Sequence, residues 1–296
     1  MRFGFVVPHA DAREFAEIAA LGERHGWDGV FTWEAVFGVH AWATLAAAAM
    51  VTERIRLGTL LSPVARWRPW DLASAVGTVD RLSGGRVTMS VGLGAVHDGW
   101  TAFEPDEGRS VRAGKLDECL AIYDGLLRGQ PFGYEGQYFS VRPTEFLLPA
   151  PPVQRPHPPV WVVGGWVPGR DRQPSLDRAA RWEGLLPGVI EADGQRHVRS
   201  PDELAEITGL VRPRREALGR GGEPYDVVLE ADSTGEFVKL DPPDPASWAA
   251  AGATWWVESW WTLPHSPDGL AEVRRRVEAG PPAAGPPSAG PARSEA

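Results

Sequence analysis

The chain has 296 residues, of which 43% are hydrophobic and 23% charged, a composition that is ordinary for a globular protein and unlike that of a disordered chain. Its net charge of −9 and pI of about 5.3 would repel a nucleic-acid backbone or an anionic membrane on average. The first apolar run, residues 3–7, is too short for a signal peptide, and no later stretch approaches the roughly 18 apolar residues of a membrane span. We therefore expect a cytoplasmic protein.

The single cysteine, Cys119, cannot form an internal disulfide and offers no pair of thiolate ligands for a metal. It falls at helical spacing with Leu116, Leu120, Tyr123 and Leu127, so we expect a buried core thiol. We predict no metal site.

From the N-terminus, short β-rich runs alternate with longer segments of helical period, the pattern of βα units around a parallel sheet. Asp11 suits the N-cap of the first helix, and Pro69 suits the first turn of the third, where a missing N–H costs nothing. The expected strands of this half are residues 3–7, 29–33, 55–61 and 86–91.

The middle of the chain departs from this alternation. Residues 92–108 are expected to form a loop, 109–128 a long helix, and 132–148 a hairpin excursion rather than a barrel strand. We interpret the region as an insertion over the barrel mouth.

Regular units resume after the proline-rich residues 149–159. The expected strands are residues 160–163, 184–186, 226–231 and 254–258, and the expected helices are 175–181, 201–218, 245–251 and 268–278. Eight strands predict an α/β fold, a (β/α)8 TIM barrel with an insertion region near its mouth, over residues 1–279. Residues 280–296, mostly Pro, Ala, Gly and Ser, predict a disordered tail.

In such a barrel the residues at the carboxyl ends of the strands form the site, whatever the reaction. Glu34, Glu230 and Glu258 would lean into one mouth, where burial and like charge can make one of them an acid or a base. The alternative is that each is paired with an arginine such as Arg66 or Arg68. Tryptophans also fall there, which suits a planar ligand but equally fills space: Trp33, Trp100, Trp166, Trp260 and Trp261.

Gly164 and Gly165 follow an expected strand and precede a helix. Their unhindered N–H groups and the helix N-terminus could converge on a phosphate, with Arg170 near enough to add a charge. A tight turn between strand and helix also needs glycine for backbone reasons. The residues alone support the two interpretations equally.

Several segments together resemble the luciferase-like monooxygenase family, the bacterial luciferase superfamily of flavin- and deazaflavin-dependent oxidoreductases. They occur in the family's order and cover the chain to about residue 190, beyond which the likeness is mainly one of strand and helix rhythm. The segments are residues 23–33 (ERHGWDGVFTW), 52–63 (TERIRLGTLLSP), 68–70 with 80–94 (DRLSGGRVTMSVGLG), 152–165 (PVQRPHPPVWVVGG) and 178–185 (RAARWEGL).

The resemblance implies a barrel that binds FMN, or alternatively coenzyme F420, across its mouth and carries out hydride or oxygen chemistry at the ring. By position, Gly164, Gly165 and Trp166 correspond to the backbone that holds the cofactor phosphate. The Leu60–Leu61 link falls where this family often has a non-prolyl cis peptide. The implied cofactor-binding set is Leu60, Leu61, Gly92, Gly94, Gly164, Gly165 and Trp166.

Many members carry an acidic residue and a histidine after the second strand, where this chain reads Trp33-Glu34-Ala35. The usual catalytic histidine is absent from that place, and His40, His9 or Glu34 could substitute. We take Glu34 and His40 as catalytic candidates. The candidates for substrate contact are His9, Trp33, Arg66, Glu230, Glu258 and Trp260.

The predicted function is that of a flavin- or deazaflavin-dependent oxidoreductase, in the first instance a monooxygenase, acting on a small organic substrate. Two alternatives stay open: a non-catalytic flavin-binding barrel, given the missing histidine, and a glycoside hydrolase, which would use two carboxylates at strand ends and tryptophans that stack on sugars. The expected partners are the cofactor and the substrate. A homodimer is also open, and neither nucleic acid nor a membrane is expected.

Overall fold

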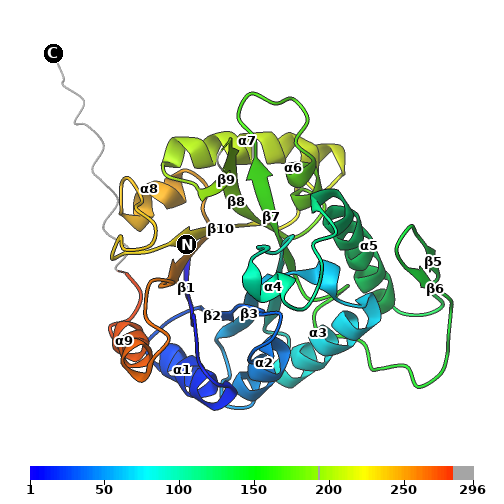
Figure 1. Ribbon diagram of the computed structural model, residues 1–296, viewed down its shortest axis with the longest axis horizontal. Helices are drawn as coiled ribbons and strands as arrows, with labels where there is room; N and C mark the ends of the chain where they lie inside the picture. The colour runs from blue at the N-terminus through cyan, green and yellow to red at the C-terminus, as the bar shows by residue number, and fades with distance from the viewer. Residues whose placement is uncertain (193, 283–296) are drawn as a thin grey trace.

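Eight parallel strands close into a barrel in the computed structural model, which describes residues 1–192 and 194–282 (Figure 1). Each strand pairs with the next, and β11 returns to pair with β1. The predicted fold class is confirmed. In barrel order the strands are β1 (Arg2–Val6), β2 (Gly29–Thr32), β3 (Arg56–Ser62), β4 (Val87–Val91), β7 (Val160–Trp166), β8 (Gly184–Glu191), β10 (Asp226–Ala231) and β11 (Trp255–Ser259).

A helix follows each barrel strand and covers the outside of the barrel (Figure 1). Asp11 caps the first helix in a capping box with Glu14, and Pro69 begins α3, as predicted. None of the helices in the described residues is both long and apolar enough to cross a membrane. The outer helices are α1 (Ala12–Arg24), α2 (Ala41–Ala49), α3 (Pro69–Ser83), α5 (Arg109–Arg128), α6 (Pro174–Ala179), α7 (Pro201–Ala217), α8 (Pro245–Ala250) and α9 (Pro267–Glu278).

Large aromatic rings fill the interior of the barrel. Phe31, Trp161 and Trp255 are fully buried there, with ring centroids 5.3 to 5.9 Å apart. Glycines on the strands make room for them: a Cβ at Gly4 would lie 2.8 Å from the Phe31 ring. Cys119 is buried among the outer helices, as predicted. Because the interior is packed, a ligand has to bind at the mouth of the barrel rather than within it.

The region between β4 and β7 has two parts. The loop with α4 (Asp98–Thr101) lies at the barrel mouth, and α5 has the predicted bounds. The hairpin of β5 (Tyr134–Glu135) and β6 (Ser140–Val141) lies outside α5 (Figure 1). The part of the predicted insertion at the mouth is therefore the loop with α4, whereas the hairpin is held against α5, where Glu118 accepts hydrogen bonds from the backbone N–H groups of residues 137–139.

Two barrel strands run further than predicted. β7 continues through Gly164 and Gly165 to Trp166, and β8 continues to Glu191, where the antiparallel strand β9 (Gly194–His197) follows. The two glycines therefore stand within a strand rather than after it, and both pair with residues of β8. The predicted tail lies outside the described residues from residue 283 onward.

Candidate functional site

A cavity of about 740 Å³ lies at the carboxyl ends of the barrel strands, a volume within the usual range for small-molecule sites. Strands β3, β7 and β8 supply an apolar wall to it. The wall residues are Leu60, Leu61, Val162, Val163 and Leu186. The other lining residues form an acidic group at β2, a cationic side at α5 and α6, and an aromatic end at β9 and β10.

The peptide bond between Leu60 and Leu61 is cis, at the place where the family resemblance implies one. Both leucines line the cavity. Gly92 lies against them, and a Cβ there would come within 3.0 Å of Leu61 Cδ2 and 3.1 Å of Val163 Cγ2. The glycine therefore lets this wall approach the backbone after β4 closely.

Glu34 lies in the cavity wall beside Leu61. Its backbone N–H donates to the Leu61 carbonyl (3.3 Å), its Oε2 accepts from Ser62 Oγ (2.6 Å), and its Oε1 accepts from Trp67 Nε1. Burial raises the pKa of Glu34, while the hydrogen bonds from Ser62 and Trp67 and the charge of Arg66 lower it. A fixed carboxyl group under opposing influences of this kind suits proton exchange.

Each of the three glutamates predicted at the mouth accepts a hydrogen bond from a tryptophan indole. The pairs are Trp67 with Glu34, Trp261 with Glu230 (2.6 Å) and Trp256 with Glu258 (2.8 Å). Within residues 1–192 and 194–282 none of these glutamates forms an ion pair with an arginine, and Arg66 pairs with Glu104 through two bonds of 3.0 Å. An indole N–H holds a carboxyl group in place without adding a positive charge beside it.

Arginines from α5 and α6 line the cavity on the β4–β7 side. Arg178 binds Asp117 through hydrogen bonds of 2.6 and 2.8 Å, and Arg112 pairs with Asp106. Arg109 lines the same side of the cavity. This side therefore gathers three arginines, the charge that an anionic group would need.

Gly165 lines the cavity next to these arginines, but its N–H already donates to Ser175 Oγ (3.0 Å), which in turn donates to the Val163 carbonyl (3.1 Å). Residues 167–173 separate β7 from the short helix α6. The Gly165 N–H is therefore not free, although its bond to Ser175 places the first turn of α6 beside it. Phosphate binding by this backbone stays a prediction.

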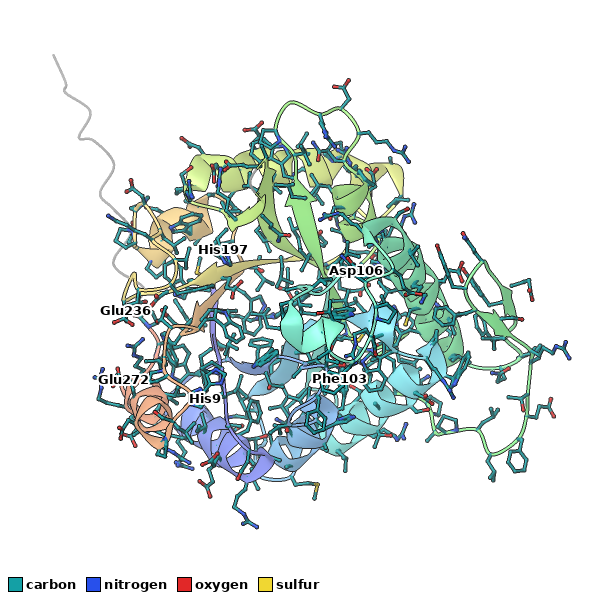
Figure 2. The ribbon with its side chains drawn as sticks, in the orientation of Figure 1. His9, Phe103, Asp106, His197, Glu236 and Glu272 are labelled. Atoms are coloured by element: carbon teal, nitrogen blue, oxygen red, sulfur yellow. The ribbon has the colours of Figure 1, made fainter. Side chains whose placement is uncertain are left out.

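The opposite end of the cavity is aromatic and acidic. Its lining residues are Trp33, His197, Glu230, Phe237 and Trp261. Glu230 Oε2 lies 3.5 Å from His197 Nδ1. Figure 2 shows His197 across the barrel opening from Phe103, which belongs to the loop after α4.

Eight of the residues proposed for the site from sequence line the cavity, namely Trp33, Glu34, Leu60, Leu61, Gly92, Gly94, Gly165 and Glu230. His40 does not. It is the N-cap of α2, where its Nδ1 accepts from the Ala43 N–H (3.3 Å), and its ring stands perpendicular to that of Trp67 at 6.0 Å. Its place is therefore behind Trp67, which contacts Glu34.

Two other predicted substrate contacts are placed outside the cavity. His9 stacks on His265 with ring centroids 4.7 Å apart and lies beside α9 (Figure 2). Its Nε2 also lies 3.4 Å from the Ser266 carbonyl, so His9 contacts the loop after β11. Arg66 lines a smaller neighbouring pocket of about 290 Å³, held there by its ion pair with Glu104.

The remaining four predicted site residues lie in the layer between the barrel and its helices. They are Glu258, Trp260, Gly164 and Trp166. Glu258 lies on the same face of β11 as Trp256, because side chains alternate along a strand, and Ser233 binds it there. Trp260 is buried against Phe5 and Trp27. A Cβ on Gly164 would meet Leu185, and Trp166 is buried in the same layer.

Sequence reasoning missed the residues that line the cavity from outside the strand ends: Arg109, Arg112, Arg178, Arg196 and His197. The three-residue spacing of Arg109 and Arg112 places both on one face of a helix, and could have indicated a cationic surface. The dipeptide Asp193-Gly194 is a hairpin signal and could have revealed β9.

Comparison with known proteins identifies the family. Residues 1–170 match the family model described as luciferase-like monooxygenase. An uncharacterized protein of Mycobacterium tuberculosis is 30% identical over 213 residues, which span 72% of this chain and 66% of that protein. An F420-dependent glucose-6-phosphate dehydrogenase of Rhodococcus erythropolis is 28% identical over 298 residues, which span 90% of this chain and 85% of the relative.

Solved structures share the fold. The coenzyme F420 dependent tetrahydromethanopterin reductase of Methanopyrus kandleri superposes with a TM-score of 0.69 at 16% identity, over 94% of this chain and 98% of that one. The oxygenating constituent of 3,6-diketocamphane monooxygenase of Pseudomonas putida, in complex with FMN, superposes with a TM-score of 0.61 at 18% identity. The match covers 78% of this chain and 67% of that one.

The chain belongs to the luciferase-like monooxygenase family. Named relatives are F420-dependent dehydrogenases, and one structural neighbour is a monooxygenase in complex with FMN. This membership argues against the glycoside hydrolase alternative.

Proposed function

We propose that this chain is an oxidoreductase that binds a flavin-type cofactor in the cavity and exchanges a hydride between it and a small organic substrate. The Leu60–Leu61 wall would contact the cofactor ring, and the arginines of α5 and α6 would hold its phosphate. The observation that carries this proposal is the combination, in one cavity, of an apolar wall, a cationic side and a buried carboxyl group.

The residues present fit such a cofactor. Trp100 Nε1 and Arg112 Nε are buried at the edge of the cavity and have no hydrogen-bond partner among the described residues. Buried donors are normally satisfied, so an acceptor-rich ligand is expected beside them. The phosphate and ribityl chain of a flavin-type cofactor carry such acceptors.

Coenzyme F420 is our first candidate and FMN our second. Arg109 adds a cation beyond Arg112 and Arg178, which suits the acidic tail that F420 carries beyond its ribityl phosphate. The Rhodococcus relative, matched over 90% of this chain, is also named for F420. FMN ends at the phosphate and has no acidic tail for a further arginine to bind. The structural neighbour that holds FMN matches 78% of this chain, a smaller share than the Rhodococcus relative does.

The bound cofactor would supply hydride chemistry, while the chain supplies positioning and proton exchange. The apolar wall excludes water from the reacting face. The arginines hold the anionic end, and Glu34 exchanges a proton with the substrate heteroatom. In this role Glu34 replaces the histidine that many relatives carry after the second strand.

The phosphorylated sugar named for the Rhodococcus enzyme is not part of this proposal. A phosphate ester requires an uncommitted cation at the substrate end. Arg196 precedes His197 and lines the cavity, but it donates to both Glu191 (2.7 Å) and Glu203 (2.7 and 3.0 Å). Glu230 adds a further negative group there.

Absorbance-monitored titration of the full chain with F420 and with FMN, in separate experiments, tests the proposal. We expect saturable spectral change with F420 and weaker or no change with FMN. Saturation by FMN alone would transfer the assignment to FMN. Saturation by neither cofactor would contradict the proposed function.

A further inference from the structure

Two perpendicular aromatic pairs flank Glu230. Trp33 and Trp261 have ring centroids 6.4 Å apart and planes at 80°, and His197 and Phe237 have centroids 5.0 Å apart and planes at 70°. All five side chains line the same cavity and are only partly buried. Ring faces at this end are therefore available to a ligand, with a carboxylate between them.

One oxygen of Glu230 is free to bind a ligand. Oε1 accepts from Trp261 Nε1 (2.6 Å), which fixes the carboxylate. Oε2 has His197 Nδ1 at 3.5 Å, too long for a good hydrogen bond, and accepts no other hydrogen bond within residues 1–192 and 194–282. A ligand N–H group would satisfy it.

The charge around Glu230 is negative. Arg196 of β9 lines the cavity, but its hydrogen bonds to Glu203 and then to Glu191 raise its pKa and commit its guanidinium. His197 is the other basic side chain at this end. The arginines of α5 and α6 that line the cavity, Arg109, Arg112 and Arg178, lie on the opposite side.

We propose that the Glu230 end of the cavity is a subsite for an organic cation, a protonated amine attached to a ring or a short apolar group. The carboxylate would accept the ammonium N–H, and the faces of Trp33, Trp261 and Phe237 would contact the cation and its apolar group. Aromatic faces attract cations through the ring quadrupole, most strongly for tryptophan. The same site would repel an anion.

This subsite deepens the proposed function. It rests on that function in one respect, that the bound cation is taken to be the substrate. Binding of the cation itself does not depend on the cofactor. The two proposals can therefore fail separately, and cofactor titration should accompany every binding measurement described below.

Three probes of similar size differ in charge: benzylammonium, benzyl alcohol and benzoate. Isothermal titration calorimetry with the full chain measures their affinities at about pH 8, where a primary ammonium group is still protonated. We expect benzylammonium to bind at least about tenfold more tightly than benzyl alcohol, as a desolvated cation–aromatic contact and a charged hydrogen bond together require. Benzoate should bind most weakly.

Glu230→Gln is the decisive variant, because the amide oxygen can still accept from Trp261 and so preserves the local structure. In this variant the affinity for benzylammonium should exceed that for benzyl alcohol by less than about threefold. The affinity for benzyl alcohol itself should not change. Glu236→Gln is the matched control. Glu236 is exposed, pairs with Arg276 of α9 and lies outside the cavity (Figure 2), so this variant should retain the full preference.

Trp261→Leu tests the contribution of the aromatic ring faces. It should lower the affinity for both benzylammonium and benzyl alcohol. Equal affinities of benzylammonium and benzyl alcohol for the unaltered chain would overturn the inference, as would a preference that survives Glu230→Gln or tighter binding of benzoate. Loss of cation binding with normal cofactor binding would leave the proposed function intact. Cofactor failure with normal cation selectivity would contradict only the proposed function.

Discussion

At the scale of single residues, Glu34 is subject to two opposing effects. Burial raises its pKa, and the donors Ser62 and Trp67 oppose this. A carboxyl group whose folded-state pKa is raised stabilises the fold below its unfolded-state pKa, and this stabilisation is lost as the pH rises through the folded-state value. Above that pH the chain would therefore carry a partly desolvated charge that a purely structural residue would not need.

Glu34→Gln removes this charge and keeps the shape. We expect the free energy of unfolding to rise by on the order of 1 kcal/mol at about pH 8, and by less at about pH 4.5, since replacing a desolvated charge is often stabilising. Urea denaturation at the two pH values measures the difference. A variant that is less stable than the parent at about pH 8 would show that the hydrogen bonds to the ionised form outweigh its burial.

The same variant also tests the proposed role. Cofactor affinity should not change, whereas turnover of a substrate, once one is found, should fall about 10²-fold if Glu34 exchanges a proton. Unchanged turnover and unchanged substrate affinity would make Glu34 structural.

At the scale of elements, α5 and α6 are joined at the cationic side of the cavity by Arg178 and Asp117. Arg178→Met removes both this ion pair and the cation, whereas Asp117→Asn removes the ion pair and leaves the cation. We expect Arg178→Met to weaken cofactor binding about tenfold or more, as loss of a charged hydrogen bond does. Asp117→Asn should bind the cofactor at least as tightly as the parent chain.

Cofactor titration and thermal unfolding of both variants measure the two effects. The ion pair is partly exposed, so both variants should lose at most about 1 kcal/mol of stability. Equal loss of cofactor affinity in both would mean that the ion pair positions the helices and that Arg178 itself does not hold the anion.

Elements also mark the limit of what could be predicted from sequence. All eight strands were predicted because each βα unit repeats a local pattern, yet β8 was ended too early at Leu186 because Pro187 and Gly188 interrupt its apolar run. The pairing of Gly188 with His197 of β9 continues the strand, and long-range pairing of this kind is not encoded in local propensity. His197 was missed for that reason.

The candidate site could be predicted where the barrel geometry dictates it and not elsewhere. Glu34, Leu60 and Leu61 follow from their positions at strand ends and from the family resemblance. Glu258 also lies at a strand end, but the alternation of side chains turns it toward the helices. One residue of register decides between the two faces, and boundary predictions are not accurate to one residue.

At the scale of the whole molecule, the fold separates stability from function along the barrel axis. The packed interior below the mouth consists of aromatic rings set against glycines, and the cavity above it is lined by loops, helices and strand ends. In barrels of this type, changes in the first region should affect folding and changes in the second should affect binding.

Gly184→Ala and Gly209→Ala test this separation with the same chemical change at two sites. A Cβ on Gly184 would clash with the indole of Trp161 and lie 3.0 Å from the Asp226 carbonyl, whereas a Cβ on Gly209, exposed in α7, meets no atom within 4 Å. We expect Gly184→Ala to lower the free energy of unfolding by about 1–3 kcal/mol, the usual effect of overpacking. Gly209→Ala should raise it by about 0.5–1 kcal/mol, because alanine favours the helix.

Neither glycine lines the cavity, so both variants should bind the cofactor with the affinity of the parent chain when measured well below their unfolding temperatures. Chemical denaturation and cofactor titration on the same preparations provide the two readouts. If Gly184→Ala kept its stability, the aromatic interior would have to be loose enough to absorb a methyl group. If it stayed folded but lost cofactor affinity, the packed interior would be shaping the mouth, and the division between the two regions would be wrong.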